Sequence, residues 1–252
     1  LEEWRAMYTF RDFNHFIKIY MLATECMQTP ADFAFMTERF LAQQARHNVK
    51  YSEVYLSASF MLDKFPRDEI FAALSEGARR GEEKYGTRLR FIPDIARHEP
   101  ETRHRVLDFV LAGHEYGIFI GLGLGGLEVG YPPEVFTDVY AEARRQGLHL
   151  VAHAGETEGA ESVWGSIRSL KAERIGHGVR SIEDPELVEY LAQTQWGTNQ
   201  NLPEYDPNKS KKFNIDQKID DDPFTMEELN QVIFKAKKDK TPGPDELSIN
   251  LI

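Results

Sequence analysis

The sequence has little cysteine, no long apolar segment and a deficit of positive charge. Cys26 is the one cysteine among 252 residues, which excludes an internal disulfide and a thiolate zinc cluster and is typical of cytoplasmic proteins. No stretch approaches the roughly 20 apolar residues of a membrane span. The chain opens on Leu1 within a charged segment, so we expect neither a signal peptide nor a native N-terminus. Lys and Arg number 30 against 41 Asp and Glu, which argues against a nucleic acid or an anionic membrane as the main partner.

Composition changes sharply near residue 195. Residues 1–195 contain 17 Arg, 5 Lys and 19 Ala, whereas residues 196–252 contain 8 Lys, one Ala and no Arg. The difference predicts two parts of different origin, joined by fusion, insertion or faulty gene prediction. The alternative is one protein with a polar C-terminal tail. Few apolar residues occur over 196–223, so we expect disorder there.

The first part alternates between helical and strand patterns. Apolar spacing predicts one helix before Pro30 and another that begins at Pro30, with Thr29 as its cap. Further helices are expected over 68–84, 101–115, 133–146, 159–170 and 185–193, and strands over 51–56, 88–92, 116–122, 148–153 and 173–175. This alternation favours a parallel sheet, either doubly wound or part of a (β/α)8 barrel.

Polar residues at the ends of the predicted strands favour a site there. His153 ends an apolar strand, and Glu156 follows it after two small residues. An imidazole and a carboxyl can therefore face one pocket at a turn where the backbone carries little bulk. Hydrolysis at a carbonyl-type carbon uses a metal ligand or base and a proton donor in such a place. The structural alternative is a Glu that caps a helix beside a core His.

A second histidine, His177, stands between two glycines at the end of the next predicted strand. Because parallel strands end at one edge, where barrels carry their chemistry, we expect His153 and His177 to be close. The preceding strand ends in Gly121-Leu-Gly-Leu-Gly-Gly-Leu-Glu128, and its small residues predict close approach of the backbone to a small molecule. The same glycines have the spacing of a dinucleotide fingerprint, but no acidic residue ends a following strand where that motif requires one.

These motifs resemble the adenosine deaminase family of zinc aminohydrolases. The resemblance covers residues 1 to about 195 and rests on these stretches: Phe10-Arg-Asp-Phe13, Val49-Lys-Tyr-Ser-Glu-Val54, Gly121 to Glu128, His-Ala-Gly-Glu at 153–156 and Arg-Ile-Gly-His-Gly at 174–178. It implies an α/β fold of the TIM type, a (β/α)8 barrel. It also implies zinc and the conversion of a 6-aminopurine nucleoside to its 6-oxo product and ammonia. Adenosine, deoxyadenosine, adenine and a futalosine-type nucleoside all remain open as the substrate.

The resemblance also assigns roles to residues. It implies that His153 is a zinc ligand, that Glu156 gives a proton to the purine ring and that His177 orients and activates the metal-bound water. Zinc fits this chemistry because it lowers the pKa of bound water to about 7. The further contacts with the nucleoside that it implies are the backbone of Gly126 and a helical lid with Phe13 and Phe16.

Two motifs of the family are missing from the sequence. The family's first strand carries two zinc ligands in His-x-His, and its last strand carries Asp-Asp. No His-x-His occurs here, and the family pattern stops near Gln195, so we expect an incomplete barrel without its first and last strands. An open sheet exposes edges through which chains associate. Because a catalytic zinc has three protein ligands as a rule, the alternative function is an inactive fragment or fusion product that lacks most zinc ligands.

The tail contains two further patterns. Asp220-Asp-Asp-Pro223 mimics the family's last motif, but no apolar strand precedes it, so we expect no metal role for it. Thr225 and Glu228 form the capping box of a helix predicted near 225–238. The Lys-rich run that follows, with Pro242-Gly-Pro-Asp245, resembles the opening segment of retroelement reverse transcriptases, without the polymerase carboxylates.

Overall fold

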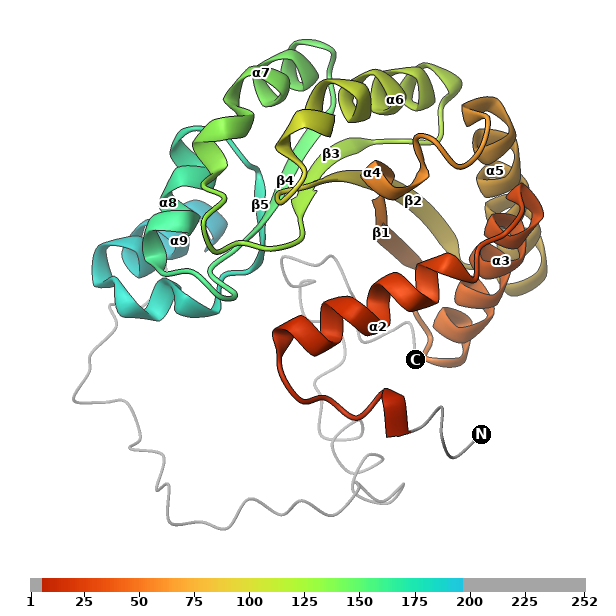
Figure 1. Ribbon diagram of the computed structural model, residues 1–252, viewed down its shortest axis with the longest axis horizontal. Helices are drawn as coiled ribbons and strands as arrows, with labels where there is room; N and C mark the ends of the chain where they lie inside the picture. The colour runs from red at the N-terminus through yellow and green to blue at the C-terminus, as the bar shows by residue number, and fades with distance from the viewer. Residues whose placement is uncertain (1–5, 197–252) are drawn as a thin grey trace, which may run out of the picture. The chain divides into compact units, whose positions relative to one another are not determined.

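A computed structural model describes residues 6–196 of the chain. Five parallel strands form one sheet in the order β1-β2-β3-β4-β5 (Figure 1). The strands are β1 (Tyr51–Ser57), β2 (Arg88–Ala96), β3 (Gly121–Gly125), β4 (His149–Ala154) and β5 (Arg174–His177). The sheet curls with helices on its outer face, which is the architecture of an incomplete TIM-type barrel and confirms the predicted fold class.

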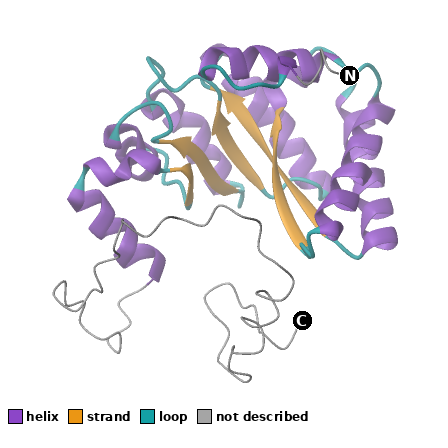
Figure 2. Ribbon diagram, turned by 90° about the horizontal axis from the view of Figure 1, so that it is seen from below, coloured by secondary structure: helices purple, strands orange, loops and turns teal. Residues whose placement is uncertain are grey.

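Helices connect each strand to the next. The α-helices are α2 (Phe13–Glu25), α3 (Pro30–Arg46), α4 (Ala58–Met61), α5 (Arg67–Tyr85), α6 (Arg103–Tyr116), α7 (Thr137–Arg145), α8 (Ala160–Arg168) and α9 (Pro185–Trp196). Short 3-10 turns are η1 (Pro100–Thr102), η2 (Pro133–Phe136) and η3 (Val179–Glu183). Figure 2 shows the strands flanked by these helices. Residues up to Val188 form one compact unit, and α9 continues beyond it.

The core lies between the outer face of the sheet and the helices. Three phenylalanines from different parts of the chain show how it packs: Phe71 of α5, Phe109 of α6 and Phe119 before β3. Their ring centroids are 5.1 to 5.4 Å apart, and all three side chains are buried. Burying aromatic side chains of this size contributes about 1.5–3 kcal/mol each, so this cluster fixes α5 and α6 against the sheet.

Local sequence signals set the element ends largely as expected. Pro30 begins α3, and the carboxylate of Asp32 accepts a hydrogen bond of 2.7 Å from the backbone N–H of Thr29. The five predicted strands and the helices between them are present, which confirms the alternation. The tail helix predicted near 225–238 and Asp220 to Asp222 lie outside the described residues, as does the segment predicted to be disordered over 196–223 apart from its first residue, which ends α9.

The bounds of β2 and β3 differ most from those predicted, whereas the other three strands lie within two residues of the prediction at each end. The strand expected over 116–122 is wrong at its start, because α6 extends to Tyr116 and Gly117 ends it in a left-handed conformation with φ of 90°. The buried Ile118 and Phe119 pack into the core instead, and β3 begins only at Gly121. In contrast, β2 continues past its expected end through Pro93 to Ala96. The longer strand brings additional side chains to the C-terminal edge of the sheet.

The two outer strands of the sheet are β1 and β5. Edge strands can pair with another chain, so the association expected through sheet edges stays a prediction. Among residues 6–196, no helix combines the length and the apolar character needed to cross a membrane.

Candidate active site

The C-terminal ends of β4 and β5 bring two histidines together. Parallel pairing matches His153 with Gly176 and Ala154 with His177, so the two imidazoles leave neighbouring strands at one end of the sheet. Their ring centroids are 4.9 Å apart. Gly176 makes this approach possible, because a Cβ at that position would lie 3.0 Å from Nδ1 of His153.

Glu156 joins the two histidines from the turn that follows β4. Its Oε2 lies 3.5 Å from Nε2 of His177, and the side chains of Glu156 and His177 are 32% and 37% exposed, so a ligand can reach both. His177 has a φ of 64°, a left-handed conformation that residues with a Cβ seldom adopt. The structure thus brings His153, Glu156 and His177 into one cluster, the histidine cluster.

His153 is held as a neutral imidazole. Desolvation, with smaller effects from His177 and Arg97, lowers the pKa of His153 to about 4. Tyr55 of β1 packs against the ring, with 4.4 Å between the ring centroids. A neutral imidazole keeps a nitrogen lone pair, and this is the form that can bind a metal ion.

A buried carboxyl that the sequence did not single out, Asp94 of β2, lies beside these rings. Strand register places it opposite Ser57 of β1 and Gly123 of β3. Desolvation raises the pKa of Asp94 to about 6, although a hydrogen bond with Ser57 acts in the opposite direction. The hydroxyls of Ser57 and Tyr20 are also hydrogen bonded, at 2.7 Å, so a polar chain connects α2 through β1 to Asp94.

The glycines of β3 make room for protein side chains. A Cβ at Gly123 would lie 2.9 Å from Cε1 of Tyr55, and a Cβ at Gly125 would lie 2.5 Å from Oδ2 of Asp94. The expectation that this run admits a small molecule is therefore too broad, since these two glycines accommodate Tyr55 and Asp94. Gly126 follows at the end of the strand with φ of 83°, so it occupies the edge where its predicted backbone contact would have to form.

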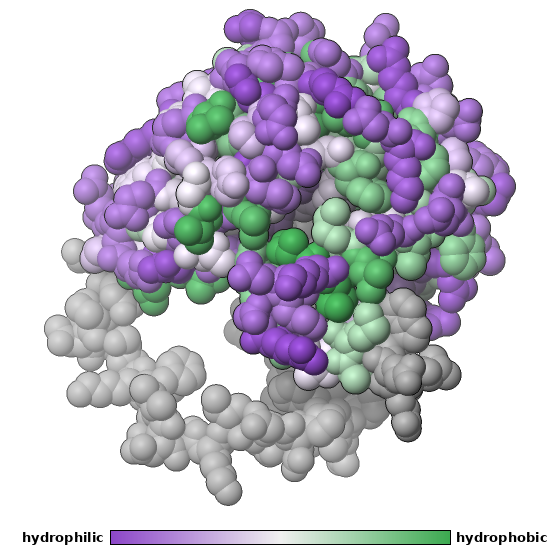
Figure 3. Space-filling view, in the orientation of Figure 1, coloured by the Kyte–Doolittle hydropathy of each residue, from purple (hydrophilic) through white to green (hydrophobic). Residues whose placement is uncertain are grey.

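Phe13 and Phe16 lie on α2, a helix without buried residues. Their ring centroids are 5.9 Å apart, and Phe16 also packs against Tyr20 at 6.3 Å. Phe16 is 47% exposed, and hydrophobic residues are visible at the surface beside α2 (Figure 3). Over residues 6–196, neither phenyl ring has a ring contact with His153 or His177. The structure therefore places the two phenylalanines on an exposed helix and does not bring them into the histidine cluster.

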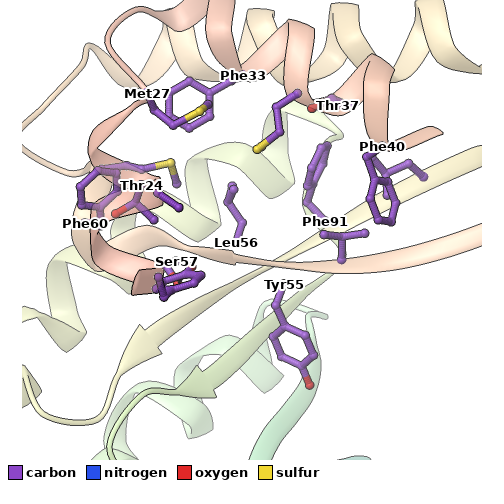
Figure 4. Close-up of a pocket in the computed structure, with 16 residues that line it drawn as sticks. Thr24, Met27, Phe33, Thr37, Phe40, Tyr55, Leu56, Ser57, Phe60 and Phe91 are labelled. Atoms are coloured by element: carbon purple, nitrogen blue, oxygen red, sulfur yellow. Dashed lines mark hydrogen bonds between the residues drawn. The ribbon is translucent and has the colours of Figure 1, made fainter. Parts of the chain in front are cut away.

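An apolar cavity of about 310 Å³ lies on the other side of β1, next to α2 and α3. Leu56 points into it toward Phe33 and Phe60, whereas Tyr55 projects to the opposite side of the strand (Figure 4). This alternation is the ordinary consequence of strand geometry. The cavity and the histidine cluster therefore lie on opposite faces of β1.

The comparison with known proteins agrees with the strand-end motifs. A family model described as adenosine deaminase matches residues 1–223. The chain belongs to the adenosine deaminase family. The match continues past residue 195, where we expected the family pattern to stop.

Similar proteins include several deaminases of this family. The chain is 37% identical to an adenine deaminase from Geotalea uraniireducens over 77% of its length, and 35% identical to an aminodeoxyfutalosine deaminase from Streptomyces avermitilis over 74%. It covers 54% and 53% of those proteins, so it spans about half the length of the curated relatives it matches. A crystal structure of an adenine deaminase from Arthrobacter aurescens superposes with a TM-score of 0.72 at 30% identity, over 77% of this chain and 59% of that one.

Zinc is implied by the family, and a related amidohydrolase from Burkholderia ambifaria, 28% identical over 66% of this chain, was crystallised with bound Zn. The described residues offer such an ion the neutral imidazole of His153. Within residues 6–196, however, no group of three or more His, Cys, Asp or Glu side chains is arranged to hold a metal ion. Since a catalytic zinc has three protein ligands as a rule, these residues do not form a zinc site by themselves.

Proposed function

We propose that the histidine cluster belongs to a deaminase centre that hydrolyses a 6-aminopurine nucleoside to its 6-oxo product and ammonia. The observation that carries this proposal is the convergence of Glu156 and His177, 3.5 Å apart and both accessible, beside the neutral His153. The names of the similar proteins, adenine deaminase and aminodeoxyfutalosine deaminase, support the reaction class and keep adenine as an alternative substrate.

The roles of the two accessible side chains follow from their chemistry. Water adds to C6 of the purine, the ring nitrogen takes up a proton and the amino group leaves as ammonia. We assign Glu156 as the proton donor to the ring, since a carboxyl group beside the substrate can serve as a general acid. His177 orients the attacking water, accepts one of its protons and passes that proton to the departing amino group, while the second proton of the water restores the Glu156 carboxyl. Zinc, as the family implies, would require ligands from outside residues 6–196 in addition to His153.

A second candidate function is a purine-binding protein without catalysis, and the absence of a three-ligand metal group among residues 6–196 favours it. Ammonia release from adenosine and from adenine by the 252-residue chain with added zinc separates the two candidates. Zinc-dependent release that Glu156→Gln abolishes supports the deaminase. Adenosine binding without ammonia release supports the second candidate, and absence of both contradicts the two proposals together.

A further inference from the structure

One carboxylate organises the turn that carries Glu156. Glu128 follows β3 and is only 5% exposed. It accepts hydrogen bonds from four consecutive backbone N–H groups, those of residues 155 to 158, at 2.6, 3.1, 2.8 and 3.0 Å. The hydroxyl of Thr157 adds a fifth contact at 3.3 Å. Four successive N–H groups can converge on one point only if the backbone curls around it, and such a concave arrangement of N–H groups binds an anion.

The backbone of the same turn is adapted to this arrangement. Gly155 has φ of 70°, and a Cβ there would lie 2.7 Å from Cγ2 of Val163. A side chain at this position would therefore both strain the backbone and collide with α8. In the conformation that the turn adopts, the Glu156 side chain reaches His177.

A buried cation, Arg97, holds the two segments that flank this arrangement. Arg97, after β2, is 1% exposed and donates hydrogen bonds to the carbonyl oxygens of His153 at 2.6 Å and Tyr131 at 2.8 Å. Tyr131 lies three residues after Glu128, and its N–H donates to the Glu128 carbonyl at 3.1 Å. Arg97 thus connects the end of β4 to the segment that supplies Glu128.

We propose that Glu128 is a positioning residue, whose carboxylate fixes the turn at 155–158 so that Glu156 faces His177. The function of that positioning rests on the proposed deaminase or purine-binding site. The structural part does not, because it concerns only the conformation of the turn. Charge-assisted hydrogen bonds are about twice as strong as neutral ones, so a carboxylate suits this position better than an amide of the same shape.

Hydrogen exchange of the 252-residue chain tests the positioning directly. In the unmodified chain, the amides of residues 155, 157 and 158 are expected to exchange as slowly as those of β4, although they lie in a turn. Glu128→Gln keeps the side-chain shape but replaces one acceptor oxygen by a donor, and is expected to accelerate these amides about 10- to 100-fold relative to β4 amides. The matched control is Glu161→Gln, an exposed carboxylate in the first turn of α8, which should change none of them.

The outcomes distinguish the structural part of the proposal, the conformation of the turn, from its functional part, the effect on the proposed site. Fast exchange of the turn in the unmodified chain overturns the positioning role, and so does a Glu128→Gln variant that accelerates β4 and the turn equally. If Glu128→Gln prevents folding, the measurement on the unmodified chain still decides. Adenosine affinity then tests the link to function: Glu128→Gln should weaken binding at least tenfold, but have little further effect when Glu156→Gln is already present. Equal effects in both backgrounds would contradict a role through Glu156, whereas absence of binding by the unmodified chain counts against the proposed function alone.

Discussion

The two ends of the strand order, called here the β4–β5 side and the β1 side, hold their polar groups in different ways. On the β4–β5 side, Glu156 lies in a turn whose backbone N–H groups donate to Glu128, and the strand before it is held by a hydrogen bond of 2.6 Å from Arg97 to the carbonyl of His153. On the β1 side, α2 has no buried residue, and a bond between the Tyr20 and Ser57 hydroxyls connects it to the sheet. The turn that carries Glu156 is therefore fixed by buried side chains, whereas α2 is attached to the sheet through side chains that are partly exposed.

The difference corresponds to two separate requirements of a catalytic site, rigid positioning of the reacting groups and access for the ligand. Groups that transfer protons must be held within a fraction of an ångström, since small displacements cost large factors in rate. An element that covers a ligand must move to admit it. The geometry of the β4–β5 side suits the first requirement, and α2, which has no buried residue, would suit the second in its predicted role as a lid. Substitutions on the two sides should therefore differ in the size and reach of their effects.

The largest effect is expected from Arg97. Arg97→Met keeps much of the length of the side chain but removes the hydrogen bonds to the carbonyls of His153 and Tyr131 and a buried cation that interacts with Glu128. Breaking such a buried arrangement costs about 3–5 kcal/mol of unfolding free energy. Urea denaturation measures the loss, with the exposed Arg67→Met as control. A loss below about 1 kcal/mol would mean that the hydrogen bonds of Arg97 do not stabilise the β4–β5 side.

A gain in stability is expected from Asp94→Asn. The pKa of Asp94 is about 6 in the folded chain against an ordinary 3.8, so the folded state holds the proton more tightly. This contribution is complete below pH 4 and is lost as the pH rises through 6, which corresponds to about 2–3 kcal/mol. Asp94→Asn should therefore raise the unfolding free energy by about that amount at pH 7.5 and by little at pH 4. The exposed Asp108→Asn should show no such pH dependence, and an equal gain at both pH values would contradict the interpretation.

The opposite pH dependence is expected from His153. Its folded pKa of about 4 lies below the ordinary 6.5, so its contribution to stability is complete above pH 6.5 and is lost as the pH falls toward 4. Because the ring is half-buried, we expect about 2 kcal/mol. Between pH 4 and 6 this opposes the effect of Asp94, and the two partly cancel in the unmodified chain. His153→Gln should therefore leave the effect of Asp94 unopposed, so that the unfolding free energy rises as the pH falls from 6 to 4. His47→Gln should leave the profile unchanged.

The smallest effect belongs to the β1 side. Tyr20→Phe removes the hydrogen bond to Ser57 and should cost about 1 kcal/mol, mainly as opening of α2. Limited proteolysis should cut within α2 several times faster, while hydrogen exchange in β4 stays the same. Tyr116→Phe, at the exposed end of α6, is the control. Faster exchange throughout the sheet would show that α2 is a core element and would remove the contrast between the two sides.

The sequence predicted those features that are written in adjacent residues. Pro30 after Thr29 marks a helix start, and a histidine that ends an apolar strand marks a strand end, so α3, β4 and β5 were found. The approach of His153 to His177 followed from parallel pairing. Each of these rests on a local pattern together with one topological rule.

The features that were missed depend on distant residues. Asp94 escaped because the strand was expected to end at residue 92, before Pro93. Arg97 and Glu128 escaped because a buried charge has no local signature: Arg97 donates to a carbonyl 56 positions away, and Glu128 accepts from amides 27 to 30 positions away. The strand expected from residue 116 starts before β3 does, because the apolar Ile118 and Phe119 have the same pattern in a buried core segment as in a strand. Such partners become visible only when the strands have been placed side by side.

The backbone conformation of His177 sets folding stability against the proposed function. Its left-handed conformation costs roughly 1–2 kcal/mol for a residue with a Cβ, and Gly or Asn adopts it more easily. Selection for heat resistance alone should therefore drive residue 177 toward glycine or asparagine and erase the imidazole, whereas selection for catalysis should retain the histidine. Variants of residue 177 that are selected for thermal stability should therefore also be assayed for the proposed deaminase activity.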